Sequence, residues 1–111
     1  MHTQTVTVKP SGRMDRITAK GLRQKFEAIA HSNIKTLILD MESVVFMDTF
    51  GLGMLISVLK LSRAMKFDFI IQSITSEQVK DLLILTQTYK LLKIESECLN
   101  FKAREYMSGL Q

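Results

Sequence analysis

Short apolar runs alternate along the chain with segments whose apolar residues recur at helical spacing, and this alternation constrains the fold most strongly. Residues 36–39, Thr36-Leu37-Ile38-Leu39, form one such run, which predicts a strand buried on both faces of a sheet. Repeated strand–helix–strand units with short loops imply right-handed crossovers. The sequence therefore predicts an α/β domain with a central mixed sheet of about four strands and about four helices, one sheet face being partly open.

Three further segments have the pattern of short strands. Residues 5–8 alternate between polar and apolar side chains, and Pro10-Ser11-Gly12 is expected to end that strand. Residues 67–71 and 91–94 predict two more strands near the end of the chain. Residues 44–47, Val44-Val45-Phe46-Met47, could form a short strand or pack as an apolar plug.

Helical spacing appears in four segments. We expect helices over residues 17–30 and from Thr49 or Phe50 to about residue 65. Thr75-Ser76-Glu77-Gln78 resembles a capping box, with Thr75 at the N-cap and Gln78 three residues later, so a third helix should follow it. Ser96 can cap a last helix through about residue 106.

The predicted helix that begins at Phe50 has two apolar stripes. Packing of the second stripe under a neighbouring helix is one interpretation, because methionine commonly fills cores. The alternative is a surface for a partner or for a homodimer, because Met-rich surfaces adapt to what they bind. The inner stripe comprises Leu52, Leu55 and Leu59, and the second comprises Met54, Val58, Leu61 and Met65.

Length and composition are those of one globular domain. The chain has 111 residues, of which 46% are hydrophobic and 23% charged, enough to fold without disulfides or metals. Cys98 is the only cysteine, and no Cys/His set has metal-ligand spacing, so no metal or other cofactor is expected. There is no signal peptide and no apolar stretch long enough for a membrane span, which predicts a cytoplasmic protein.

The net charge of +4 comes from scattered basic residues without interleaved aromatic side chains. A nucleic-acid-binding surface would require a basic stripe, so direct nucleic-acid binding is not expected. Enzyme and nucleotide-binding functions are also disfavoured. The chain has no Gly-rich phosphate loop with a lysine and no convincing Ser/His/Asp or Cys/His set. A receiver domain would require an acidic cluster after its first strand. This chain has Lys9-Pro10-Ser11 there, so a receiver domain is not expected.

The most unusual segment is residues 46–53, in which Asp48, Thr49, Gly51 and Gly53 stand between an apolar loop and a long helix. The start of a helix offers free backbone N–H groups and a partial positive charge, so it can receive a phosphate attached to Thr49. The simpler interpretation is that Asp48 or Thr49 caps the helix while the glycines allow tight packing. Capping explains the glycines poorly, because glycine inside a helix costs about 0.5–1 kcal/mol relative to alanine.

Phe46-Met47-Asp48-Thr49-Phe50-Gly51-Leu52-Gly53 resembles the Phe-Met-Asp-Ser-Ser-Gly-Leu-Gly signature of the STAS family. Bacterial anti-sigma factor antagonists are the best-known small members of that family. Gly12-Arg13-Met14-Asp15 is similar to the family's Gly-x-Leu-Asp turn, and Leu37-Ile38-Leu39-Asp40 to its strand before the signature. Leu83-Ile84-Leu85-Thr86 with residues 91–94 resembles its C-terminal helix and strand. The likeness covers nearly the whole chain and implies a single STAS domain over residues 1–111.

The resemblance implies a phosphorylation switch rather than an enzyme. An anti-sigma factor that is also a serine/threonine kinase would phosphorylate Thr49, and a cognate phosphatase would reverse this. The unphosphorylated form would bind the kinase and release the sigma factor. The residues expected to contact or orient partners are Asp15, Asp48, Phe50, Gly51, Gly53 and Met54. Asp15 and Asp48 could instead be ordinary turn and cap residues.

Three departures from the family pattern leave alternatives open. Thr49 stands where serine is commoner in the family. Phe50 stands where serine or alanine is usual. The Phe50 side chain could anchor a partner, pack across the loop or block a kinase. Only residues 3–9 precede the Gly-x-Leu-Asp turn, where the family usually has two strands. The alternative function is a STAS accessory subunit of a transporter or stressosome-like complex that undergoes no phosphorylation.

Overall fold

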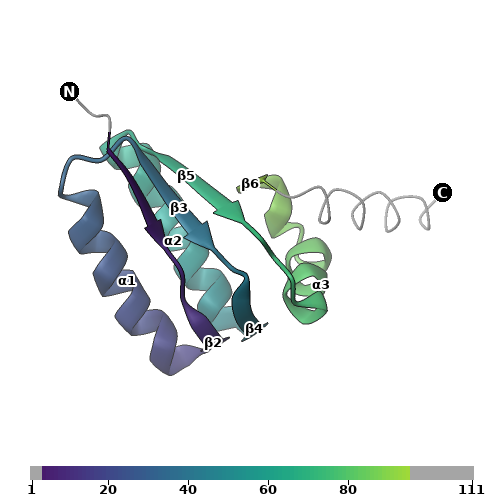
Figure 1. Ribbon diagram of the computed structural model, residues 1–111. Helices are drawn as coiled ribbons and strands as arrows, with labels where there is room; N and C mark the ends of the chain where they lie inside the picture. Colours follow the sequence, from purple (N-terminus) through teal and green to yellow (C-terminus); the bar gives the residue numbers. More distant parts are fainter. Residues whose placement is uncertain (1–3, 96–111) are drawn as a thin grey trace.

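The computed structural model describes residues 4–95, in which strands and helices alternate along the chain (Figure 1). No helix in this described part is both long enough and apolar enough to cross a membrane. The elements are β1 (Thr5–Val8), β2 (Ser11–Met14), α1 (Arg16–Ala30), β3 (Thr36–Asp40), β4 (Ser43–Met47), α2 (Thr49–Met65), β5 (Asp68–Gln72), α3 (Glu77–Leu85), the 3-10 turn η1 (Thr88–Lys90) and β6 (Lys93–Glu95).

The strands form two parallel sheets. The larger has four strands in the order β1-β3-β5-β6, and the smaller pairs β2 with β4. This confirms the predicted α/β architecture, although every pairing among residues 4–95 is parallel, so the sheet is not mixed. Residues 4–95 contain three α-helices rather than four. The fourth helix predicted from the sequence, from Ser96 to about residue 106, lies outside the described residues.

The core lies on one face of the four-stranded sheet. Leu37 and Leu39 of β3 are fully buried, and Phe69 of β5 meets Phe26 of α1 edge to face with ring centroids 6.5 Å apart. Helices α1 and α2 pack against each other, and α2 passes behind β3 in Figure 1. Ile38 and Ile70 on the other face are only half-buried. The prediction that β3 is buried on both faces is therefore wrong.

The β1–β3 pair continues beyond a bend as the β2–β4 pair. The expectation that Pro10-Ser11-Gly12 simply ends a strand was incomplete, because β2 begins at Ser11 and pairs with β4. Gly12 has a φ of +81°, which glycine adopts without strain, and the register shifts between Gly12 and Arg13. Of the two interpretations for residues 44–47, the strand is confirmed. The smaller sheet therefore carries the chain past the end of the larger one.

Side chains from the start of α3 bind the edge of β4 that β2 leaves free. The Gln78 side chain pairs with Met47 twice: its Oε1 accepts the Met47 N–H at 2.8 Å, and its Nε2 donates to the Met47 carbonyl at 2.7 Å. The Ser76 and Thr75 hydroxyls donate to the carbonyls of Val45 and Glu42 at 3.1 and 2.9 Å. Strand β4 is thus held on both edges, by β2 on one side and by these side chains on the other.

The predicted capping box at residues 75–78 is therefore corrected. The N-cap is Ser76, whose Oγ accepts the Val79 N–H at 3.3 Å. Thr75 and Gln78, the two residues assigned to the box, instead make tertiary hydrogen bonds to Glu42, just before β4, and to Met47 at its end. The sequence motif identified the correct helix but placed its N-cap one residue too early. The reason is that the Thr75 and Gln78 side chains bind neighbouring backbone groups instead of capping α3.

We predict that Gln78→Ala lowers the free energy of unfolding by about 1–3 kcal/mol, because it leaves two partly buried backbone groups of Met47 without partners. Urea denaturation measures the change. Gln24→Ala is the matched control, since Gln24 is exposed on α1. Equal, small effects of the two substitutions would show that Gln78 does not hold β4 in place.

Candidate functional site

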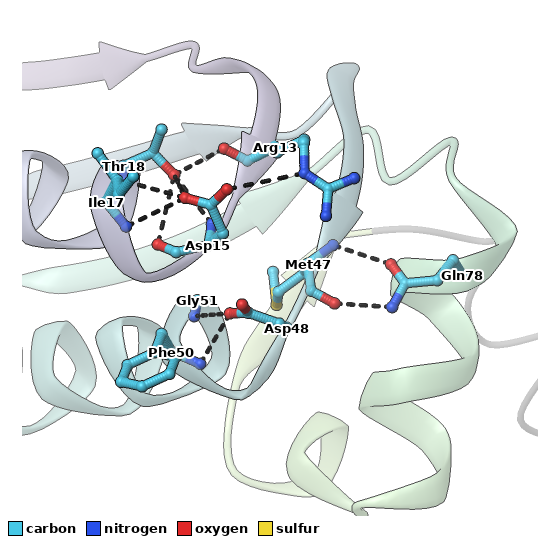
Figure 2. A network of polar contacts seen from close by, with 9 residues as sticks. All are labelled: Arg13, Asp15, Ile17, Thr18, Met47, Asp48, Phe50, Gly51 and Gln78. Carbon is cyan, nitrogen blue, oxygen red and sulfur yellow. Dashed lines mark hydrogen bonds and ion pairs between the residues drawn. The ribbon is translucent and has the colours of Figure 1, made fainter.

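The site is built where β2 and β4 end together. The parallel register pairs Met14 with Met47, so the residues that follow them, Asp15 and Asp48, start helices α1 and α2 side by side. The Asp48 N–H donates to the Met14 carbonyl at 3.2 Å and joins the two turns directly. Two residues far apart in the sequence therefore occupy equivalent positions in adjacent strand-to-helix turns (Figure 2).

Asp48 is the N-cap of α2. Its Oδ1 accepts the N–H groups of Phe50 and Gly51 at 2.9 and 3.2 Å, which satisfies two of the helix's free donors. Thr49 is the first residue of the helix and its side chain is exposed. Its hydroxyl makes no hydrogen bond to any residue in the described range 4–95. Because Asp48 does the capping, the Thr49 oxygen is left available at the surface.

Asp15 caps α1 through a reciprocal box. Its Oδ1 accepts the N–H groups of Ile17 and Thr18 at 3.1 and 3.2 Å, and its own N–H donates to the Thr18 Oγ1 at 2.9 Å. The hydrogen bond from the Thr18 N–H is the main cause that lowers the pKa of Asp15, and the Ile17 N–H, the Thr18 hydroxyl and Arg13 act in the same direction. The carboxylate is therefore ionised at neutral pH.

Arg13 links the Asp15 turn to the neighbouring strand. Its guanidinium lies 4.0 Å from the centroid of the Phe46 ring, and its Nε lies 3.7 Å from Asp15 Oδ2. The Thr18 hydroxyl also donates to the Arg13 carbonyl at 2.7 Å. These contacts fix the Asp15 turn against β4, which leads directly to Thr49.

The two signature glycines have different roles. A Cβ at Gly51 would lie 2.5 Å from the Met14 carbonyl oxygen and 2.7 Å from Met47 Cγ, so only glycine allows α2 to approach β2 this closely. Gly53 is exposed, and a Cβ there would meet nothing within 4 Å. The packing interpretation therefore accounts for Gly51, and Gly53 is left without a packing role.

The structure separates the predicted site residues into a surface group and a buried group. Thr49, Gly53 and Phe50 are exposed, the last at 54%, while Asp15 and Asp48 are half-buried. Gly51 and Met54 are buried, and Met54 has no exposed surface at all. We therefore correct the prediction for these two residues: they support the site from within and are not available for contact.

Sequence reasoning missed two exposed apolar residues on the elements that build the site. Ile17, in the first turn of α1, is 80% exposed, and Val45 on β4 is 65% exposed. Ile17 falls outside the apolar spacing that identified α1, and that departure was the available signal. Exposed apolar side chains are more frequent at the centre of protein-contact surfaces than on the rest of a protein surface. No group of three or more His, Cys, Asp or Glu in the described residues could hold a metal ion.

Comparisons with known proteins agree with this geometry. The model for the STAS domain matches residues 1–98. An anti-sigma factor antagonist structure from Thermotoga maritima superposes with a TM-score of 0.73 at 21% identity, covering 87% of this chain and 85% of that one. The structure of the anti-sigma factor antagonist SpoIIAA in its unphosphorylated form gives 0.65 at 16% identity, with coverage of 98% and 94%. The STAS domain of a SulP transporter from Vibrio cholerae gives 0.65 at 16% identity, with coverage of 94% and 82%. At these identities the structural likeness establishes the fold alone.

We predict opposite effects for alanine at the two signature glycines. Gly51→Ala should destabilise the protein by about 1–3 kcal/mol, because the new methyl group meets a backbone carbonyl. Gly53→Ala should stabilise it by up to about 1 kcal/mol, because alanine favours an exposed helical position. Thermal and urea denaturation of both variants measure this. Similar effects at the two positions would contradict the close approach of α2 to β2.

We predict that Asp15 makes part of the protein's stability dependent on pH. Its pKa in the folded protein lies below the ordinary value of 3.8, so its contribution is present above that value and is lost as pH falls through the lowered pKa. Asp15→Asn should therefore be less stable than the native protein at pH 7, and the difference should shrink as the pH falls below 3.8. Urea denaturation across this range provides the measurement, with Glu27→Gln as the exposed control. A difference that does not change with pH would contradict the assignment.

Proposed function

Because the chain belongs to the STAS domain family, we propose that it is a partner-switching regulator controlled by phosphorylation of Thr49. In this proposal the unphosphorylated protein binds an anti-sigma factor that is also a serine/threonine kinase, as an anti-sigma factor antagonist does. A cognate phosphatase resets the switch. The chain acts in the cytoplasm as a substrate and binder rather than as an enzyme. STAS-type relatives that include anti-sigma factor antagonists support this class of function.

The observation that carries the proposal is the unengaged Thr49 hydroxyl on a rigid turn. Asp48 fills the capping position, Gln78 holds Met47, and Gly51 seats α2 against β2. A kinase can therefore reach the hydroxyl without unfolding any element. The partial positive charge at the start of α2 also favours a phosphate there, although the Asp48 carboxylate already accepts the Phe50 and Gly51 N–H groups.

Charge explains how phosphorylation would release the partner. A phosphothreonine carries about −1.5 to −2 charges, and Asp48 and Asp15 already place two carboxylates in the adjoining turns. A partner that accepts the neutral hydroxyl beside these carboxylates would meet a much more negative surface after phosphorylation. The change is local and electrostatic, so the fold can remain the same in both states.

The proposed contact surface surrounds Thr49. Phe50 offers a large exposed aromatic side chain, and Ile17 offers an exposed aliphatic one. Gly53 has no side chain, so a partner can approach the backbone of the next turn of α2. Apolar anchors of this kind dominate the affinity of many interfaces. Asp15 and Asp48 cap the two helices that carry these residues, and Asp15 Oδ2 also lies 3.7 Å from Arg13 Nε.

A second candidate is a STAS accessory subunit that docks on a transporter or a stressosome-like complex without a phosphorylation cycle. The observation that favours it is Phe50, a large exposed aromatic residue that follows Thr49 in the sequence and that a kinase would have to accommodate. The similarity to a SulP transporter STAS domain also supports this class. The two candidates share the contact surface and differ in whether Thr49 receives a phosphate.

The test is to mix the protein with candidate anti-sigma kinases and ATP and to map phosphate by mass spectrometry. The proposal predicts about one phosphate per chain, located on Thr49 and lost in Thr49→Ala. Thr7→Ala is the matched control, since Thr7 is also exposed, on β1, and should leave phosphorylation unchanged. Tight partner binding with no phosphate under any kinase would overturn the switch and favour the accessory subunit.

A further inference from the structure

A groove runs between α1 and α2 and starts at Phe50, the residue next to Thr49. It consists of two hollows, of about 420 and 300 Å³, which share Arg23 and Glu27. On α1 it extends from Arg16 to Glu27, a distance of about 16 Å at the rise of an α-helix. We call this the α1–α2 groove. It is long enough to hold an extended or helical segment of another protein.

The rim of this groove on α1 is basic. Arg16, Lys20 and Arg23 are spaced by four and three residues and line the same hollow, and Glu27 is its one acidic residue. None of these three basic side chains forms an ion pair within residues 4–95. Their charges are therefore not balanced by the part of the fold that the structure describes.

The position of Arg16 is unfavourable for the helix itself. Arg16 is the first residue of α1, where the helix dipole favours negative charge, and the first turn contains no acidic residue. Like charges four residues apart, as at Arg16 and Lys20, also repel each other on a helix. Helix stability thus does not explain this charge pattern, whereas binding of an acidic partner does.

Apolar surface accompanies the basic rim. Phe50 lines one end, and its ring is 54% exposed. Leu61 of α2, which is half-buried, lines the second hollow, whereas Ala19 and Val58 also line the groove but are almost fully buried. Apolar surface flanked by basic side chains is the chemistry that receives an amphipathic helix with acidic flanks.

We propose that the α1–α2 groove docks an acidic amphipathic segment of the partner protein that contacts Thr49. The carboxylates of this segment pair with Arg16, Lys20 and Arg23, and its apolar side chains pack against Phe50 and the groove. The identity of the partner rests on the function proposed above, because the groove begins beside Thr49. A phosphate on Thr49 would add negative charge at that end and repel the acidic segment.

The probe is a synthetic amphipathic helical peptide of about four turns, with leucines on one face and glutamates flanking them. Fluorescence anisotropy measures its affinity, and NMR of the ¹⁵N-labelled protein maps where it binds. The proposal predicts shift changes at Ala19, Phe50 and Leu61, together with affinity that falls as salt rises. Lys20→Glu combined with Arg23→Glu should weaken binding by about tenfold or more.

The matched control is Lys25→Glu combined with Lys35→Glu, which changes the net charge equally at exposed residues outside the groove. This control should weaken binding by less than about threefold. Three results would each overturn the proposal. The first is an equal loss of peptide affinity in the two variants, and the second is equal affinity for a peptide with glutamine in place of glutamate. The third is binding of the protein to phosphatidylglycerol vesicles without the peptide. The peptide-binding assay contains no kinase, so a negative result there would not bear on whether Thr49 is phosphorylated. Conversely, failure to find a phosphate on Thr49 would not change the measured affinity for the peptide.

Discussion

The parallel pairing of β2 with β4 is the interaction on which the site depends. Its register places Met14 beside Met47, so the two strands end together and the aspartates that follow them cap adjacent helices. Gly51 then allows α2 to approach the Met14 carbonyl, and Gln78 holds the other edge of β4. A two-stranded ribbon is weak alone, and these contacts from both sides make it a rigid support.

In this arrangement the residues that stabilise the turn differ from the residue proposed to be phosphorylated. Asp48 satisfies the first N–H groups of α2, which leaves the neighbouring hydroxyl of Thr49 with no structural duty in the described part of the chain. A phosphate added there changes the charge of the surface without removing a cap or opening the core. The basic α1–α2 groove begins one residue away, so the same change of charge can act on a second point of partner contact.

Helices and strands that have a clear local sequence pattern were predicted correctly. Elements that depend on pairing with residues far away in the sequence were missed. Helices α1 and α2 were found from apolar spacing, whereas β2 was missed because Pro10-Ser11-Gly12 is typical of a turn and the pairing with β4 is not visible locally. Helix α2 is apolar around most of its circumference, so spacing alone could not decide that Met54 lies in the core. The family resemblance named Asp15 and Asp48 as site residues, whereas their placement in adjacent turns and the roles of Gln78 and Ile17 required the structure.

The proposed switch requires that a phosphate on Thr49 changes the surface while the fold stays the same. NMR of the ¹⁵N-labelled protein with phosphothreonine installed at position 49 during synthesis tests it most directly against the unmodified protein. We predict shift changes confined to the starts of α1 and α2 and to the α1–α2 groove, with the amides of β3 and β5 unchanged. Changes spread through the buried residues of β3 and β5, such as Leu37 and Ile71, would contradict it.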